Sequence, residues 1–356
     1  MVDRMDAGYD PFARGPFPVG VRTIEATDAA RDCVFGCEIW YPASAQHAGR
    51  DRAPDTQDAF TVPPGDARRQ MAVRHAEAEP GTYPLVLFSH HSGGHRRAAA
   101  FLCTHLSSHG YVVAALDHSE VAALERARRD GAADEQKAAF AEAVGPNRVL
   151  DLILLLDRVL SHADLDPQTR LDPARIGAVG HSLGGWTVLA SASEDTRIRA
   201  VVALAPGGNS NPRPGILRLK LTFDRHRDVP TLYLVAENDV CLPLDGMYEI
   251  FERTPSARQM VILRRADHMH FMDNVEAMHE MVRAMTFPPE LAWLQQEMRP
   301  ISELCSGEQA HLFVRGLTLC HMDAVLKQHA EARRVLDGAI DEQLAKRGVD
   351  VLLHRS

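Results

Sequence analysis

Short, wholly apolar segments that alternate with helical patterns constrain the fold of this chain more than any other feature. Such segments lack the polar alternation of a half-exposed strand, so each is typical of a strand buried on both faces. Buried strands that alternate with helices predict an α/β fold, in which helices cover both faces of a mostly parallel sheet. The segments are Leu85–Phe88, Tyr111–Leu116, Ile176–Val179, Ile198–Leu204, Thr231–Val235 and Met260–Leu263.

The regions around this alternating pattern predict the domain organisation. Near the N-terminus, Val21–Thr27 and Cys33–Tyr41 predict an antiparallel hairpin, and residues 42–82 read as a long surface loop. We predict a catalytic domain at residues 10–285, with a possible lid insertion at 119–145. Residues 286–356 predict a helical C-terminal extension that could be a small cap or an interaction surface. Two adjacent prolines, Pro288 and Pro289, mark a break near its start.

Charge and composition exclude several classes of protein. The chain has 39 Lys and Arg against 48 Asp and Glu, a formal net charge of −9, so it lacks the basic footprint of a protein that binds nucleic acid or anionic membranes. No apolar run approaches the roughly 18 residues of a membrane span, and the first residues carry acids instead of an apolar stretch. We therefore predict a cytoplasmic protein. The six scattered cysteines indicate buried small residues, not a disulfide framework. Nothing indicates the oligomeric state.

The strongest catalytic signal is Gly-His-Ser-Leu-Gly-Gly at residues 180–185, directly between a predicted strand and a predicted helix. This context is that of a nucleophile elbow, which presents Ser182 on a strained turn. Side chains at 180 and 184 would clash with the serine, and glycine removes both clashes. The alternative is a glycine-rich turn with a bystander serine. The strand–turn–helix context favours Ser182 as the nucleophile.

A catalytic serine needs a base and an orienting acid, which follow it in this fold in the order acid, then histidine. Asp239 comes just past a buried strand and is the predicted acid, with Glu237 as its competitor. His268 is the first histidine after the next buried strand and is the predicted base, with His270 as the alternative. We expect Asp267 to cap or orient this loop.

Attack on a carbonyl also requires an oxyanion hole, formed by the backbone N–H after the nucleophile and by another from an earlier loop. Leu183 supplies the first. The loop Ser89–Gly94 lies between a buried strand and a helix, and its predicted donor is Ser92, or His91 beside it.

The same region is rich in histidine and arginine. His90, His91 and His95 resemble a set of metal ligands, but no carboxylate accompanies them in the sequence, and loop packing explains them better. Arg96 and Arg97 stand where a helix start can bind a substrate anion, although solvated surface charge is the commoner role. We predict neither a metal nor a cofactor.

Further strings accompany the elbow and the loops with Asp239 and His268: they are Asp10–Pro16, Pro18–Gly20, Glu38–Pro42 and Pro84–His90. Over about residues 10–271 the chain therefore resembles the α/β-hydrolase superfamily. More narrowly, it is similar to the dienelactone-hydrolase-like group that includes bacterial relatives of platelet-activating-factor acetylhydrolase. The resemblance implies a serine carboxylic-ester hydrolase without a cofactor.

The chain departs from this group at two positions. Dienelactone hydrolases use a cysteine nucleophile where this chain has Ser182. The acetylhydrolases place their acid after the strand that follows the elbow helix, and here that strand ends at Ala203–Gly207 without an acid. The later acid, Asp239, matches the arrangement of bacterial cutinase-like polyester hydrolases.

These patterns predict hydrolysis of a small carboxylic ester or lactone through an acyl-serine intermediate. The alternatives are a serine peptidase or amidase and a non-catalytic hydrolase-fold binding protein. We predict short-chain substrates, because the candidate cover at residues 120–144 is charged and its apolar side chains are small. The alternative is an apolar tunnel formed by the C-terminal helices or by the loop at residues 207–228.

Overall fold

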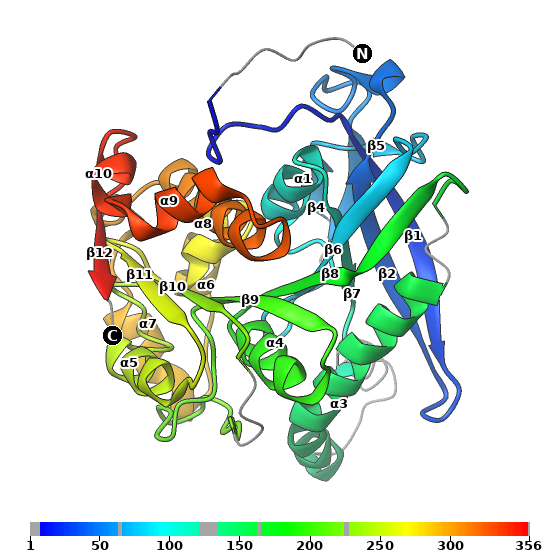
Figure 1. Cartoon of the computed structure of the whole chain (residues 1–356). Helices are drawn as coiled ribbons and strands as arrows, with labels where there is room; N and C mark the ends of the chain where they lie inside the picture. The colour runs from blue at the N-terminus through cyan, green and yellow to red at the C-terminus, as the bar shows by residue number, and fades with distance from the viewer. Residues whose placement is uncertain (1–7, 63–65, 121–133, 162–164, 224–227, 355–356) are drawn as a thin grey trace.

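The computed structural model describes residues 8–62, 66–120, 134–161, 165–223 and 228–354 (Figure 1). Its ten-stranded sheet has the order β12-β11-β10-β9-β8-β6-β7-β2-β1-β5, and the block from β11 to β7 is parallel. The strands of the sheet are β1 (Val19–Asp28), β2 (Cys33–Pro42), β5 (Val73–Arg74), β6 (Gly81–Ser89), β7 (Val112–Leu116), β8 (Thr169–His181), β9 (Ile198–Leu204), β10 (Thr231–Ala236), β11 (Arg258–Leu263) and β12 (Val351–His354).

The sequence predicted the parallel block and the N-terminal hairpin correctly. Every predicted apolar segment lies within, or overlaps, one of the strands β6 to β11. Strands β1 and β2 pair antiparallel, and β2 also pairs antiparallel with β7. The predicted α/β class is confirmed.

Helices cover both faces of the sheet (Figure 1). Helices α1, α8, α9 and α10 contribute to the hydrophobic cluster on one face, and α3, α4 and α5 to the cluster on the other. The helices are α1 (Ala100–Ser108), α3 (Asp134–Ser161), α4 (Leu183–Glu194), α5 (Leu244–Arg253), α6 (Val275–Ala284), α7 (Ala292–Glu297), α8 (Gly307–Leu326), α9 (Ala330–Asp337) and α10 (Ile340–Ala345), with short 3₁₀ turns at Ala45–His47, His268–Phe271, Pro289–Leu291 and Ile301–Glu303.

The alternation of side chains along a strand divides the core between these two faces. In β9, Val202 and Leu204 point into the cluster under α1 and α8, whereas Val201 and Ala203 point into the cluster under α3 to α5. All four are buried because helices lie on both sides. The sheet is therefore packed on both faces up to its carboxyl edge, where catalytic loops emerge in folds of this kind.

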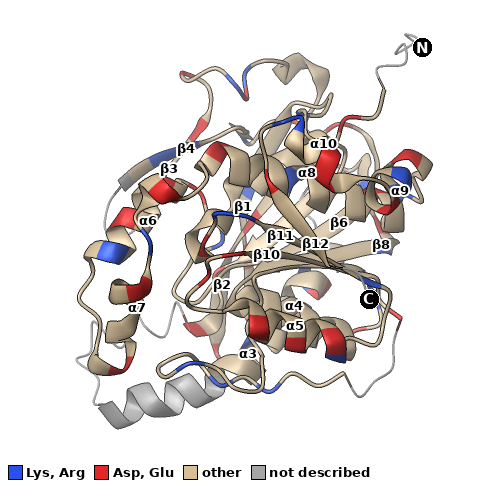
Figure 2. Ribbon diagram, turned by 90° about the vertical axis from the view of Figure 1, so that its left-hand side faces the viewer, with Lys and Arg blue, Asp and Glu red and all other residues tan. Residues whose placement is uncertain are grey.

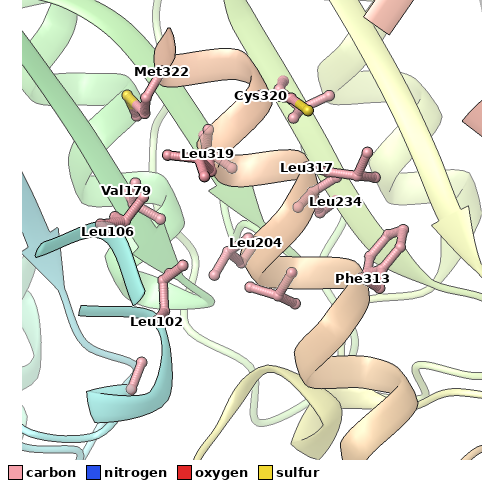
Figure 3. Close-up of a cluster of buried hydrophobic side chains, with 14 of the residues drawn as sticks. Leu102, Leu106, Val179, Leu204, Leu234, Phe313, Leu317, Leu319, Cys320 and Met322 are labelled. Atoms are coloured by element: carbon pink, nitrogen blue, oxygen red, sulfur yellow. The ribbon is translucent and has the colours of Figure 1, made fainter. Parts of the chain in front are cut away.

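The C-terminal segment is built into the same core. Phe313 and Leu317 of α8 pack against Leu204 and Leu234 of the sheet (Figure 3). Beyond the helices, β12 pairs antiparallel with β11 and forms the end of the sheet, a strand that the sequence did not predict. The division at residues 285 and 286 stays a prediction, but α8 shares the hydrophobic cluster of the sheet.

Two local predictions were wrong. Residues 42–82 are not an unstructured loop, because they contain β5 and a separate hairpin of β3 (Asp58–Val62) and β4 (Asp66–Gln70). The sequence pattern also predicts one helix over Glu120–Val144 and a second over Arg148–Ser161, but from Asp134 onward these residues form one continuous helix, α3, with Pro146 in its interior. Residues 121–133 of the predicted lid insertion lie outside the described residues.

The charge distribution gives no single basic or acidic face in the view of Figure 2. Lys and Arg positions are interspersed with Asp and Glu positions along the helices and loops. Among the helices of the described part, none combines the length and apolar character that a membrane span requires.

Candidate active site

Ser182 occupies a strained position between β8 and α4. Its φ of +59° and ψ of −118° lie where residues other than glycine are rarely found. Such a conformation costs about 1–3 kcal/mol and persists only where the surroundings enforce it. Here the Ser182 N–H donates to the carbonyl of Leu204 in β9 at 2.9 Å, and the Ser182 carbonyl accepts from Trp186 and Gly207. The backbone is thus fixed on both sides of the side chain.

The elbow glycines are required by close approaches of the backbone, not by the serine side chain itself. A Cβ at Gly180 would lie 2.1 Å from the carbonyl oxygen of Gly184. A Cβ at Gly184 would lie 2.0 Å from the carbonyl oxygen of Ser89, at the end of β6. The predicted need for glycine at both positions holds, but the clash partner is backbone, which has no rotamer with which to move away.

The structure brings Asp239 and His268 together. His268 Nδ1 lies 2.6 Å from Asp239 Oδ2, although the two residues are 29 positions apart. The other oxygen, Oδ1, accepts from the N–H groups of Cys241 (2.9 Å) and Leu242 (2.8 Å), so the carboxylate has a fixed orientation. Burial alone would lower the pKa of His268, but the charge and hydrogen bond of Asp239 outweigh burial and raise it. The imidazole is therefore a stronger base than a free histidine.

The alternative residues are engaged elsewhere. Glu237 accepts from the Arg265 N–H at 2.9 Å. His270 is buried, with Nδ1 2.8 Å from Asp267 and Nε2 3.0 Å from the carbonyl oxygen of Cys305. Asp267 also accepts from the Met269 N–H, so it caps the turn that carries His268, as predicted.

A small cavity joins the predicted site residues. It has a volume of about 180 Å³, and Ser182, His268, Ser92 and Leu183 all line it. As the first residue of α4, Leu183 has an N–H with no partner inside its helix, and no described residue accepts a hydrogen bond from the Ser92 N–H. Both N–H groups are therefore available to a ligand in this cavity.

One wall of the cavity comes from the loop that follows β9. Ile216, Leu217 and Leu219 line it. Contacts with α7 fix this loop. Arg213 donates to both carboxylate oxygens of Glu297 at 2.6 Å, and its guanidinium carbon lies 3.6 Å from the centroid of the Trp293 ring. Helix α7 therefore holds the apolar wall in place, a role that the sequence did not reveal.

Two further cavity neighbours were not foreseen. The ring of His181 lies 4.7 Å from the ring of His268, and burial keeps the pKa of His181 well below the ordinary value, so His181 stays neutral beside His268. Cys241 lines the same cavity, and burial raises the pKa of its thiol well above the ordinary value. A protonated thiol is a poor nucleophile, so Cys241 does not compete with Ser182.

A second Ser-His-Asp constellation lies below the site. Ser89 Oγ is 2.8 Å from His118 Nε2, and His118 Nδ1 is 3.2 Å from Asp151 Oδ2. All three residues are fully buried, and Ser89 lies in β6 instead of on an elbow. Burial excludes substrate from this serine, so triad geometry alone does not make an active site.

The ionisable groups around that constellation are already paired. Among described residues, the ligand atoms of His118, Glu120 and Asp151 lie within 4.8 Å of one another, close enough to hold a metal ion. However, Arg148 is ion-paired with Glu120, and Arg31 with Asp151 at 2.6 Å. Two guanidinium groups occupy the carboxylates and repel a further cation, so the donor set is that of an ion-pair network.

The arginines and histidines near the start of α1, which the sequence offers as anion or metal ligands, are paired with or packed against other protein groups. Arg96 is ion-paired with Asp117, and Arg97 with Glu38 at 2.9 Å, so neither is a free anion site. His90 and His91 are packed in the loop below the cavity, and burial lowers the pKa of each. Loop packing, as predicted, accounts for these histidines.

Comparison with known proteins identifies a family. The model of a family described as PET hydrolase-like matches residues 93–313, which include Ser182, Asp239 and His268. A solved structure of the ferulic acid esterase from Streptomyces cinnamoneus covers 89% of this chain and 93% of its own, with a TM-score of 0.63 and 23% identity. At that identity the likeness shows the fold alone, which is the predicted α/β-hydrolase fold.

Curated relatives are similarly distant. Cutinase est1 of Thermobifida alba is 27% identical over 55% of this chain and 56% of its own length. The platelet-activating factor acetylhydrolase of Cavia porcellus is 27% identical over 54% of this chain and 48% of its own. This chain thus spans about half the length of these two relatives. A cutinase of Thermobifida fusca is 24% identical over 82% of this chain and 91% of its own. The predicted resemblance to the α/β-hydrolase serine esterase group is confirmed.

Proposed function

The chain belongs to the PET hydrolase-like family, and on this premise we propose that it hydrolyses a short-chain carboxylic ester through an acyl intermediate on Ser182. Ser182 is the nucleophile, His268 the general base, and Asp239 the residue that orients His268. The backbone N–H groups of Leu183 and Ser92 form the oxyanion hole.

In the acylation half-reaction, Ser182 Oγ attacks the ester carbonyl carbon while His268 Nε2 takes the hydroxyl proton. Asp239 accepts the hydrogen bond from Nδ1–H, which leaves Nε2 unprotonated and available. The carbonyl oxygen becomes an oxyanion, and the N–H groups of Leu183 and Ser92 stabilise its charge. When the tetrahedral intermediate collapses, the carbon–oxygen bond to the alcohol breaks, and His268 gives its proton to the leaving alcohol.

Deacylation repeats these steps with water. His268 takes a proton from a water molecule, whose oxygen attacks the acyl carbon and forms a second oxyanion in the same hole. The bond between the acyl carbon and Ser182 Oγ then breaks, and His268 returns the proton to the serine. The acid product leaves and the enzyme is restored.

One observation carries the proposal. The same cavity is lined by the strained serine, by the histidine that Asp239 holds at 2.6 Å, and by Leu183 and Ser92, whose backbone N–H groups have no partner among the described residues. The buried constellation at Ser89 has the side chains but neither the cavity nor the elbow.

The size of the cavity supports a short acyl group. About 180 Å³ is below the roughly 300–1,000 Å³ that is common for pockets of drug-sized ligands. The cavity is bounded by the loop wall with Ile216 and Leu217. The cover expected at residues 120–144 does not carry this argument, because its residues 121–133 lie outside the described residues. The loop that was considered as a tunnel for long chains thus forms a wall of a small pocket.

The test is turnover of p-nitrophenyl acetate by the wild-type protein, Ser182→Ala and Ser193→Ala. Ser193 lies near the other end of α4, so it is a matched control on the same helix. We expect Ser182→Ala to abolish turnover while it remains folded, and Ser193→Ala to retain it. Turnover by folded Ser182→Ala at the wild-type rate contradicts the proposal.

The competing functions are separated with the same preparations. A peptidase or amidase would cleave the matching p-nitroanilide at a readily measurable rate in addition to the ester, and a binding protein would cleave neither. We expect hydrolysis of the ester with little hydrolysis of the anilide.

A further inference from the structure

We propose that the buried ion pair of Arg148 and Glu120 is a positioning device that turns the His91–Ser92 peptide so that the Ser92 N–H points into the oxyanion hole. This inference rests on the function proposed above and assigns a role to two residues outside the predicted site. Arg148 lies in α3 and Glu120 follows β7, so neither comes from the elements that carry Ser182, Asp239 or His268.

Arg148 is a fully buried arginine whose hydrogen bonds converge on one loop. It donates to the carbonyl oxygen of His90 at 2.6 Å and to that of His91 at 3.2 Å. Its Nε donates to Glu120 Oε1 at 2.7 Å. Burying an unpaired guanidinium would be strongly unfavourable, and Glu120 compensates for the charge. The planar, forked guanidinium suits two neighbouring carbonyls and a carboxylate at once, which a lysine ammonium does not.

The geometry of the peptide bond links these carbonyls to the cavity. In a trans peptide the C=O of one residue and the N–H of the next are coplanar and point in opposite directions. The His91 carbonyl is directed toward Arg148 and also accepts from the Gly94 N–H at 3.1 Å. The Ser92 N–H must therefore point away from Arg148, toward the cavity that Ser92 lines.

The side chain of His90 also hydrogen-bonds to the His91 carbonyl. Its Nδ1 lies 2.7 Å from the His91 carbonyl oxygen, and its Nε2 accepts from the His118 N–H at 3.2 Å. These contacts require the neutral tautomer with its hydrogen on Nδ1. Burial, and then the charge of Arg148, hold the pKa of His90 well below the ordinary value, so the neutral form is maintained.

The buried Ser-His-Asp constellation supports this arrangement from below. Arg148 Nη1 lies 3.5 Å from Ser89 Oγ, and Ser89 in turn hydrogen-bonds to His118. The constellation therefore acts as packing for the oxyanion loop, which explains why polar side chains lie deep below a catalytic site.

The test uses the double variant Arg148→Met/Glu120→Gln, which removes the guanidinium without leaving an unpaired buried charge. With p-nitrophenyl acetate we expect kcat to fall about 100- to 1,000-fold, the loss typical of one oxyanion donor, with little change in KM. The affinity for a boronic acid, which forms a tetrahedral adduct on Ser182, should fall with kcat. Arg148→Lys should give an intermediate loss.

A matched control separates positioning from stability. Arg97→Met/Glu38→Gln removes another ion pair with a fully buried carboxylate, which also pairs with Arg74 and Arg96. In the described part of the chain, no hydrogen bond or ion pair joins Arg97 or Glu38 to residues 89–94. We expect the control to lower the melting temperature without lowering kcat per folded molecule. If Arg148→Met/Glu120→Gln behaves like this control, with kcat and boronic acid affinity near wild type, the inference is overturned.

A crystal structure of Arg148→Met/Glu120→Gln provides a readout that does not depend on activity. We expect the His91 carbonyl to leave its inward position and the Ser92 N–H to turn away from the cavity. An unchanged His91–Ser92 peptide contradicts the inference. If the wild-type protein hydrolyses no ester, the proposed function fails, while the orientation of this peptide still decides the inference.

Discussion

Asp239→Asn is the substitution whose effect follows most directly from the geometry of the site. In the wild type, Asp239 Oδ1 accepts two hydrogen bonds, from the N–H groups of Cys241 and Leu242, while Oδ2 faces His268 Nδ1. An asparagine keeps its carbonyl oxygen at the two donors, which forces its NH₂ group toward His268. His268 must then accept at Nδ1 and carry its hydrogen on Nε2, where it can no longer take the proton of Ser182.

The magnitude distinguishes this tautomer change from the loss of one hydrogen bond. A hydrogen bond to a charged group contributes about 1.5–3 kcal/mol, which is about 10- to 150-fold in rate. The corresponding change in the trypsin-type triad lowers kcat about 10⁴-fold, about 5.5 kcal/mol, because the tautomer is wrong. We therefore expect a loss of kcat near the larger value, with the fold intact.

The assay is steady-state hydrolysis of p-nitrophenyl acetate, with Glu237→Gln as the control. Glu237 is also a loop carboxylate after β10, but it binds the N–H of Arg265 instead of a histidine. The control should retain near wild-type turnover. A loss below about 100-fold for Asp239→Asn, or a larger loss for Glu237→Gln, refutes the tautomer argument.

Three further predictions concern pH, chain length and stability. Because protonated His268 cannot act as a base and its pKa is raised, kcat/KM should increase with pH with an inflection above the ordinary 6.5, and an inflection below that value contradicts the ion pair with Asp239. Ile216→Ala should shift the preference among p-nitrophenyl acetate, butyrate and octanoate toward longer chains, and an unchanged profile contradicts its place in the acyl wall. Leu317→Ala in α8 should lower the free energy of unfolding by about 2–5 kcal/mol in urea titrations, and a change within error contradicts a shared core.

The predictions from sequence succeeded where the signal is local. The strands of the parallel block are apolar on both faces. A run such as Ile198–Leu204 can therefore be predicted as a buried strand without knowing which strands pair with it. That Asp239 and His268 lie at one edge of the sheet followed from the sequence because each comes after such a strand, and parallel strands bring their carboxyl ends to one edge. The pairing at 2.6 Å is the consequence of that topology.

The β3–β4 hairpin was missed although Phe60 and Val62 of β3 are buried in alternation with exposed residues, because β4 is mostly polar and polar side chains also hold the hairpin to the sheet. Gln70 accepts from the indole of Trp40 at 2.7 Å, and Arg74 donates to both oxygens of Asp58 at 2.7 Å. In a sequence, these residues look like an ordinary polar loop. Strand β12 was missed because a short C-terminal segment becomes a strand only through its pairing with β11, a non-local contact.

The buried polar network around Arg148 could not be predicted from the sequence for a related reason. Arg148 lies among the apolar positions of α3, between Val144 and Leu152, and a helical pattern does not show whether an arginine is solvated or buried. Only the fold reveals that its partners are Glu120 and the carbonyl groups of the oxyanion loop. Likewise, Ser89, His118 and Asp151 carry no motif, although they meet in space.

The most direct test of the central claim is the site at which a fluorophosphonate labels the native protein, determined by peptide mapping with mass spectrometry. The wild-type protein should be labelled on Ser182 alone, because that serine combines the elbow, the base and the cavity. Ser89 has a histidine at 2.8 Å but is fully buried, so it provides an internal comparison within the same chain. Absence of label, or label on Ser89 or another serine in place of Ser182, contradicts the account.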